Sequence, residues 1–186
     1  IHNTLEELYT PYVAKQLTIQ NIEKMQDTHK QTLQKHFEDE LGKSSHTTGK
    51  NLLLFTAAKH NLNRFLEADK QLIQSGKSIR LIAVESQNKI TRNYSGIPFP
   101  ICFKGIVDRV DLIDGQLRIL DYKTGVTEPS DLLCDTVQEL TDDPKYSKAF
   151  QVLFYSMLLS EQLQTNDTFT AGIFSLKKPS NGFMPF

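Results

Sequence analysis

The chain has 186 residues, a formal net charge of −1 and 39% hydrophobic residues, the composition of an ordinary globular domain. It contains no run of about 18 consecutive apolar residues, which excludes a membrane-spanning helix. The near-zero charge argues against binding to nucleic acid by bulk electrostatic attraction, so any such role needs a local site. The cysteines, Cys102 and Cys134, are too few for a disulfide scaffold or a four-thiolate metal site. We expect them to be buried, reduced thiols in a cytoplasmic protein.

Helical patterns fill the first part of the chain. Apolar spacing predicts a helix over residues 5–12 that is interrupted at Pro11. A second helix is predicted over 19–41 and ends near Gly42, and a third begins after Thr48, which can cap it. The apolar stripe of this third helix consists of Leu54, Ala58, Leu62, Phe65 and Leu66.

Alternating patterns follow and predict a sheet. Residues 79–85 form a first strand, and 89–94 are expected to follow it in a hairpin. Two longer strands are predicted over 103–113 and 116–123, because Asp114-Gly115 between them is a strong signal for a two-residue hairpin turn.

The end of the chain alternates again between helix and strand. Residues 128–144 are acidic and lack a clear period, which indicates a loop or an irregular helix. A helix is predicted over 146–163 and a last strand over 168–176, so the chain is a mixed α/β domain with one central sheet. The expected core-facing residues of this helix are Phe150, Leu153, Phe154, Met157 and Leu158.

Two aspartates face each other in the hairpin over 103–123. Because side chains alternate along a strand, Asp108 and Asp121 each lie on the apolar face of their strand. With residues 114–115 as the loop, the two are directly opposite, with Cβ atoms about 4.5–5.5 Å apart. Like charges in this position are destabilising, unless they share a proton or bind a cation.

Lys123 lies two residues beyond Asp121 on the same face. Two carboxylates and a lysine make a site for a hard divalent metal and an anionic substrate such as a phosphate ester. The metal would polarise a phosphoryl oxygen and lower the pKa of a bound water. The lysine would stabilise charge that develops on the phosphate, or position the water.

Other charged residues near the hairpin have structural interpretations. Asp108 could form an ion pair with Arg109 or Lys123, although Arg109 points to the other face. We expect Arg109 and Asp111 to form a polar pair that supports the fold on that other face. Glu85, at the end of the first strand, could line the site, although a salt bridge or a solvated position is favoured for it.

Three short motifs stand on the hairpin and the helix after it. Residues 105–111 read Gly-Ile-Val-Asp-Arg-Val-Asp, and residues 121–125 read Asp-Tyr-Lys-Thr-Gly. Gln151 and Tyr155 lie one turn apart, on one face of the predicted helix. Together these motifs resemble the PD-(D/E)XK nuclease superfamily, and within it the RecB-like or AddB-like exonuclease domain.

The resemblance implies a metal site. His2, followed by Leu5-Glu6, matches the second half of the Gly-x-x-x-His-x-x-Leu-Glu context in which these relatives carry a histidine. The resemblance implies that the metal ligands are His2, Asp108, Asp121 and the backbone carbonyl of Tyr122. The usual ion is Mg²⁺ or Mn²⁺, which suits oxygen-rich ligation, and a histidine ligand favours Mn²⁺.

The resemblance also implies the other site residues. Asp108, Asp121 and Lys123 would be catalytic, with Lys123 as the catalytic lysine. Gln151 and Tyr155 would bind substrate or support the site. The implied fold is restriction-endonuclease-like, with a central mixed sheet flanked by helices and an N-terminal helical region.

We expect a single nuclease domain over 1–186, with a helical part over 1–75 and the sheet and catalytic core over 76–186. The chain begins at Ile1 within a helical pattern and stops without an evident ending. It is therefore interpreted as a C-terminal fragment of a longer protein.

The implied function is that of a divalent-metal-dependent deoxyribonuclease, with exonuclease-like action in recombination or double-strand-break repair. It would leave a 5′-phosphate, and its partners would be DNA and helicase-like segments or subunits of the parent protein. The chain departs from relatives that hold an iron–sulfur cluster with four cysteines, and its acidic stretch over 131–143 would repel DNA near a binding groove. The alternatives are a catalytically inactive DNA-binding or scaffold module, and a phosphate-ester hydrolase with another substrate.

Overall fold

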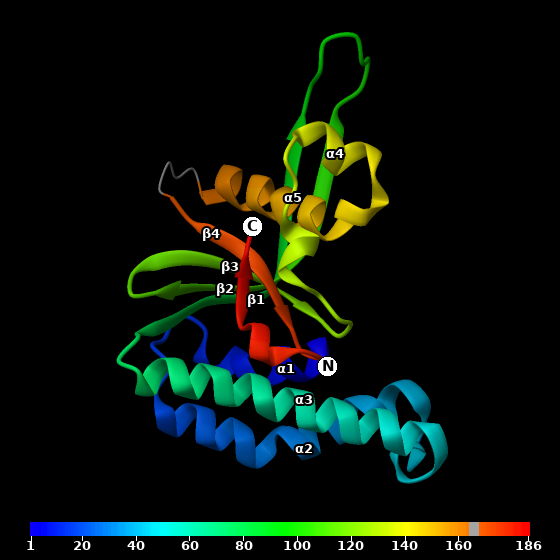
Figure 1. Cartoon of the computed structure of the whole chain (residues 1–186), viewed down its shortest axis with the longest axis vertical. Helices are drawn as coiled ribbons and strands as arrows, with labels where there is room; N and C mark the ends of the chain where they lie inside the picture. The colour runs from blue at the N-terminus through cyan, green and yellow to red at the C-terminus, as the bar shows by residue number, and fades with distance from the viewer. Residues whose placement is uncertain (164–167) are drawn as a thin grey trace.

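The computed structural model describes residues 1–163 and 168–186, which form an α/β fold around a five-stranded sheet (Figure 1). The strands follow one another in sequence order across the sheet. Neighbouring strands are antiparallel, except that β3 and β4 are parallel and are joined through the helix α5. The strands are β1 (Ile79–Arg92), β2 (Ile101–Ile113), β3 (Gln116–Lys123), β4 (Thr170–Ser175) and β5 (Phe183–Pro185).

Helices cover both faces of this sheet (Figure 1). The N-terminal helices lie against one face, and α5 with α4 lies against the other. This arrangement confirms the predicted fold, including its N-terminal helical region. No helix among the described residues is both long and apolar enough to cross a membrane. The helices are α1 (His2–Tyr9), α2 (Ile19–Leu41), α3 (Gly49–Gln74), α4 (Val137–Asp142) and α5 (Ser147–Leu163), with short 3₁₀ turns at Thr10–Tyr12, Ser45–Thr47, Pro129–Leu132, Pro144–Tyr146 and Pro179–Asn181.

The helix α2 has the predicted ends. The Thr18 hydroxyl oxygen accepts a hydrogen bond from the Asn21 backbone N–H at 3.2 Å. The Asn21 side-chain oxygen accepts one from the Thr18 N–H at 3.0 Å, which completes a capping box. The helix ends at Gly42, whose φ of 91° is readily adopted only by glycine.

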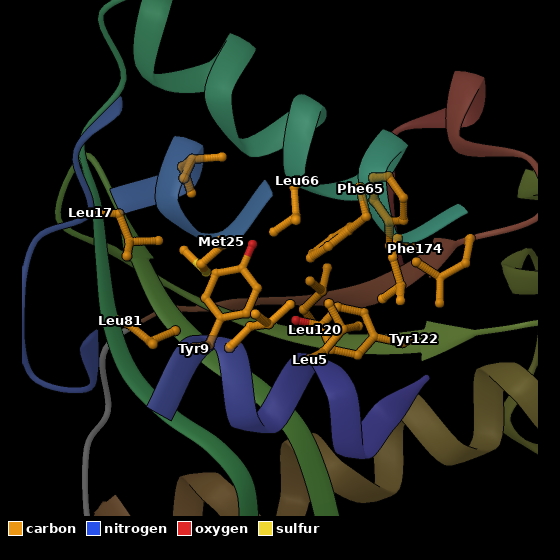
Figure 2. Close-up of a cluster of buried hydrophobic side chains, with 14 of the residues drawn as sticks. Leu5, Tyr9, Leu17, Met25, Phe65, Leu66, Leu81, Leu120, Tyr122 and Phe174 are labelled. Carbon is orange, nitrogen blue, oxygen red and sulfur yellow. The ribbon is translucent and has the colours of Figure 1, made fainter. Parts of the chain in front are cut away.

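The larger hydrophobic core lies between the N-terminal helices and the sheet (Figure 2). The predicted stripe of α3 reaches it through Leu62, Phe65 and Leu66, and burying each of these contributes about 1.5–3 kcal/mol. The stripe was wrong at its start, because Leu54 is exposed and Phe55 is buried instead.

The β2–β3 hairpin has the predicted register. Asp114 and Gly115 both have positive φ, 50° and 86°, as a type I′ turn requires. The paired positions run from Ile113 opposite Gln116 to Arg109 opposite Leu120. One further step of this register sets Asp108 opposite Asp121.

The expected hairpin at residues 85–89 does not form. β1 is one strand of 14 residues that stays paired with β2 as far as Arg92 opposite Ile101. Residues 86–88 lack the glycine that a tight turn favours. The strand continues through a register shift between Leu81 and Ala83 and through Glu85, where φ is 46°. The chain turns instead over residues 93–100. A short strand that the sequence did not predict, β5, pairs with β4.

The helix α5 buries a face that overlaps the predicted one at Leu158 but differs from it elsewhere. It packs on the sheet through Ala149, Val152, Leu158 and Leu159, whereas Phe150 and Leu153 are exposed. The prediction that both cysteines are buried was also wrong, because Cys102 is exposed. Both thiols are free, as expected. Cys102 lies on the part of the β1–β2 ribbon that extends beyond the rest of the sheet.

Candidate active site

Three carboxylates stand in one row across β1, β2 and β3. Val84 pairs with Arg109 and Ser86 with Val107, so the register sets Glu85 opposite Asp108, which in turn faces Asp121. Burial, and then the charge of Asp108, raise the pKa of Asp121 to about 6. The same two causes raise the pKa of Glu85, which is half-buried, to about 6.

Asp108 holds the N-terminal end of α1 near β3. Its Oδ2 accepts a hydrogen bond of 2.6 Å from the Tyr122 backbone N–H, and the Nε2 of His2 lies 3.4 Å from the same oxygen. His2 Nε2 also lies 3.1 Å from the Tyr122 carbonyl oxygen. The hydrogen bond to Asp108 is the main reason why the pKa of His2 is raised. The structure therefore joins three of the four predicted metal ligands by direct contacts: His2, Asp108 and the Tyr122 carbonyl.

Asp121 belongs to a chain of polar contacts that runs from β3 to α5. Lys123 Nζ lies 2.9 Å from its Oδ2 and donates a hydrogen bond of 2.6 Å to Gln151 Oε1. Gln151 in turn donates to the Tyr155 hydroxyl at 2.7 Å. The catalytic lysine and the two supporting residues implied by the motifs are thus in direct contact.

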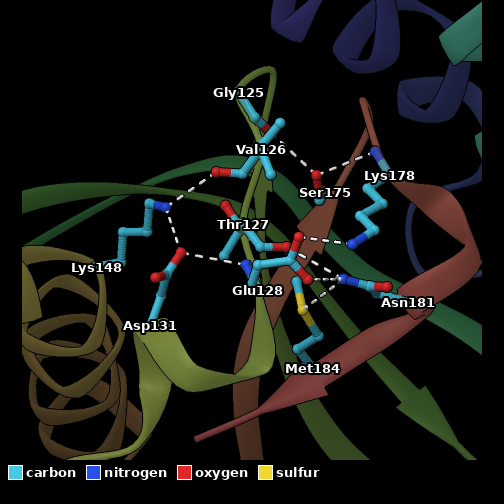
Figure 3. A network of polar contacts seen from close by, with 10 residues as sticks. All are labelled: Gly125, Val126, Thr127, Glu128, Asp131, Lys148, Ser175, Lys178, Asn181 and Met184. Carbon is cyan, nitrogen blue, oxygen red and sulfur yellow. Dashed lines mark hydrogen bonds and ion pairs between the residues drawn. The ribbon is translucent and has the colours of Figure 1, made fainter.

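A polar network fixes the loop after β3 against α5 and β4 (Figure 3). Lys148, at the start of α5, donates to the Val126 carbonyl at 3.0 Å and contacts Asp131 at 2.7 Å. On the other side, the Ser175 hydroxyl donates to the Gly125 carbonyl at 3.0 Å. These contacts set the first turns of α5 beside the end of β3, where Gln151 meets Lys123.

A second buried charge network lies on the opposite face of β2 and β3. Arg109 donates to Asp69 and to Asp111, at 2.7 Å in each case, and Arg118 donates to Asp111 at 2.8–2.9 Å. Tyr9 also donates to Asp69 at 2.7 Å. This confirms the predicted structural pair and extends it to the helices. Because Arg109 is fully buried on this face, it does not form an ion pair with Asp108.

The donors at the site suit a hard divalent cation. They are carboxylate oxygens, a peptide carbonyl and an imidazole nitrogen. Oδ2 of Asp121 is buried and accepts no hydrogen bond of good geometry, but the Lys123 ammonium already lies 2.9 Å from it. Within the described parts of the chain, however, no three His, Cys, Asp or Glu side chains are already close enough to enclose a metal ion. Instead, His2 contacts the Tyr122 carbonyl and Lys123 contacts Asp121.

Glu85 is the residue whose position sequence reasoning did not favour. A salt bridge or solvated position was preferred for it, yet it is half-buried beside Asp108 and near His2. The register of β1 on β2 would have placed Glu85 beside Asp108. The predicted hairpin at 85–89 ended the strand at Glu85, so this register was not recognised. Its positive φ costs roughly 1–3 kcal/mol, and strain of this kind is concentrated at functional sites.

Comparison with known proteins agrees with this geometry. A family model described as the PD-(D/E)XK nuclease superfamily matches residues 1–183. No curated protein matches the chain. The match spans the helical part, the hairpin with its aspartates and α5. The chain therefore belongs to the PD-(D/E)XK nuclease superfamily.

Proposed function

We propose that this chain is a divalent-metal-dependent deoxyribonuclease of the RecB-like or AddB-like type. The observation that carries the proposal is the row formed by Glu85, Asp108 and Asp121, with Lys123 as its nearest cation. Members of this superfamily are typically metal-dependent nucleases. An excess of buried carboxylates is costly without a cation, and it suits a site that acts on a phosphodiester.

In this proposal, His2, Asp108, Asp121 and the Tyr122 carbonyl hold Mg²⁺ or Mn²⁺. When bound, the ion would polarise the scissile phosphate and lower the pKa of a water molecule. The water would lose a proton as its oxygen forms a bond to phosphorus. The bond from phosphorus to the 3′-oxygen breaks and the 3′-oxygen takes up a proton from solvent, which leaves a 5′-phosphate and a 3′-hydroxyl. In this proposal Glu85, across from Asp108, accepts a hydrogen bond from that water.

Lys123 stabilises the negative charge that grows on the phosphate oxygens. Its ammonium group is held between Asp121 and Gln151, so it does not need to reorganise during the reaction. Gln151 is itself held by Tyr155. We therefore assign Gln151 and Tyr155 as positioning residues, which keep the lysine directed at the substrate.

The resemblance to RecB-like and AddB-like domains supports a role in recombination or double-strand-break repair in the cytoplasm. DNA would be the substrate, and helicase-like segments or subunits would deliver it. The alternative is a catalytically inactive DNA-binding or scaffold module. It is favoured by one observation, the lack of a ready-made group of three ligand side chains among the described residues.

The test is cleavage of end-labelled linear DNA, together with calorimetry of Mn²⁺ binding. We expect cleavage with Mg²⁺ or Mn²⁺, and its loss in Asp121→Asn and Lys123→Gln. The matched controls are Asp142→Asn and Lys145→Gln, which change exposed residues of the same types. Equal rates in site and control variants would refute the assignment of these residues. A folded wild-type protein that binds DNA but neither binds Mn²⁺ nor cleaves would support the inactive module.

A further inference from the structure

The outer part of the β1–β2 ribbon is one of the basic stretches of this near-neutral protein. Residues 86–107 contain Lys89, Arg92 and Lys104 and no acidic residue. In Figure 1 this ribbon runs past α5 and ends in the loop over 93–100 at the top of the view. A local positive region is what a near-neutral chain needs in order to attract an anionic polymer.

Four aromatic rings form a continuous strip along this ribbon and α5. The rings of Tyr94 and Phe103 are 6.4 Å apart between centroids, and those of Phe103 and Phe154 are 6.2 Å apart. Phe154 and Phe150, one turn apart on α5, lie 6.3 Å apart with an interplanar angle of 11°. The strip therefore crosses from the tip of the ribbon to the helix that carries Gln151.

The two ends of the strip are open to water. Tyr94 is 44% exposed and Phe150 is 45% exposed, while Phe103 and Phe154 are half-buried. The amphipathic pattern of α5 predicts Phe150 in the core, yet the helix buries a neighbouring face. Exposed aromatic side chains that adjoin one another indicate a binding surface more often than isolated exposed ones do.

The strip leads into the candidate active site. On α5, Phe150 and Phe154 immediately precede Gln151 and Tyr155, so the aromatic and polar pairs occupy adjacent stripes of one helix. On β2, Gly105 shares the face of Phe103, and a Cβ at Gly105 would lie 3.1 Å from the Tyr155 ring. Glycine at this position lets the ribbon approach α5 closely, which joins the strip to the site.

The charges on the ribbon favour an anionic partner. Lys89 pairs directly with Lys104 across the two strands, on the face away from Phe103. Like charges in directly opposite positions are destabilising, and within the described residues neither lysine forms an ion pair with a carboxylate. Phosphate groups close to the ribbon would relieve this repulsion. Arg92, by contrast, is ion-paired with Glu161.

We propose that Tyr94, Phe103, Phe154 and Phe150 form a base-stacking strip that binds a single nucleic acid strand and directs it to the catalytic centre. The bases of a single strand have free faces that can stack on aromatic rings, whereas in a duplex these faces are already covered. Lys89 and Lys104 point away from the strip, so they supply long-range attraction that draws the phosphates toward the ribbon and not contacts along the strip. This inference rests on the proposed function and adds to it the surface that guides the strand.

The test is fluorescence anisotropy with a labelled oligothymidine strand, and with a duplex of equal length, in EDTA so that cleavage does not interfere. Tyr94→Leu and Phe150→Leu keep an apolar side chain and remove the flat ring. We expect each to weaken single-strand binding about tenfold and to leave duplex binding unchanged. Phe186→Leu is the matched control, because Phe186 is a 44% exposed aromatic residue away from the strip. Phe150→Trp should retain binding.

Unchanged single-strand binding in both leucine variants would overturn the strip, as would an equal loss for the duplex. Altered self-association on gel filtration, with normal DNA binding, would overturn it in favour of a contact between two copies of the chain. Cleavage with Mn²⁺ is measured separately. Cleavage by the wild type with no effect of the variants on binding would refute only the strip. Strip-dependent binding without any cleavage would refute only the nuclease.

Discussion

Two buried charge networks lie on opposite faces of β2 and β3, and they differ in charge balance. On the face toward α3, two aspartates meet two arginines. On the face toward α5, the row of Glu85, Asp108 and Asp121 meets Lys123 and the partly exposed His2. Adjacent strands of one hairpin thus carry one neutral network and one with an excess of negative charge.

The balanced network has the properties of a structural element. The Arg109 guanidinium, between Asp69 and Asp111, also lies over the Tyr9 ring, 4.8 Å from its centroid, although its Nη2 has no hydrogen-bond acceptor. The unbalanced network raises carboxyl pKa values and includes a strained residue, Glu85. Such an arrangement persists where a ligand compensates it, so charge balance separates the supporting face from the candidate catalytic face.

Breaking the balanced network should have the largest effect on stability. We expect Arg109→Met to lower the free energy of unfolding by about 3–5 kcal/mol, because Asp69 and Asp111 would remain buried without their main cation. Urea denaturation followed by circular dichroism measures this change. A loss below about 1 kcal/mol would contradict the structural role of the network. Arg80→Met, at an exposed position of β1, is the control.

The unbalanced network should respond in the opposite direction. Asp121→Asn removes a buried charge that Asp108 repels, so we expect the metal-free protein to gain about 1–3 kcal/mol at neutral pH. The same variant should lose cleavage, and Mn²⁺ should stabilise the wild type more than the variant. Thermal unfolding in EDTA and in Mn²⁺ tests this, and a destabilised metal-free variant would contradict it.

The pH dependence of stability should show both networks. The folded pKa values of Asp121 and Glu85, about 6, lie above their ordinary values, so protonation as pH falls from about 7 to about 5 should stabilise the metal-free protein. The raised pKa of His2 acts in the same direction. Burial disfavours the Asp111 carboxylate, but the charges and hydrogen bonds of Arg109 and Arg118 together outweigh it and lower the pKa of Asp111. Its contribution to stability is therefore lost only below its unfolded value of 3.8.

We therefore expect the melting temperature in EDTA to rise as the pH falls to about 5 and to decline in stronger acid. In Asp121→Asn the rise should be smaller, while the decline in acid should remain. A melting temperature that falls steadily from neutral pH would contradict the raised pKa values of the carboxylate row.

The contact between α5 and Lys123 should have the smallest effect. Gln151→Ala removes the acceptor that holds the lysine, and we expect the cleavage rate to fall about tenfold with little change in stability. Gln151→Glu keeps an acceptor and should retain more activity. Gln138→Ala, on the exposed surface of α4, is the control. Equal rates in Gln151→Ala and the control would remove Gln151 from the site.

Much of the site follows from local sequence. The Asp114-Gly115 turn sets the register of β2 on β3, and this register alone aligns Asp108 with Asp121. The helix with Gln151 and Tyr155 was also predictable from its spacing. The position of His2, by contrast, was implied only by resemblance, because it lies 120 residues from its contact at Tyr122.

Determinants of this kind are local: a turn fixes the pairing of adjacent strands, a cap fixes the start of a helix, and alternation fixes the face of each aspartate. The tertiary structure decided what depends on distant partners. It kept β1 as one strand, so that Glu85 joined the carboxylate row, and it rotated α5 so that Phe150 faced water. Periodicity identifies an apolar face, but which part of it is buried depends on the shape of the surface against which the helix packs.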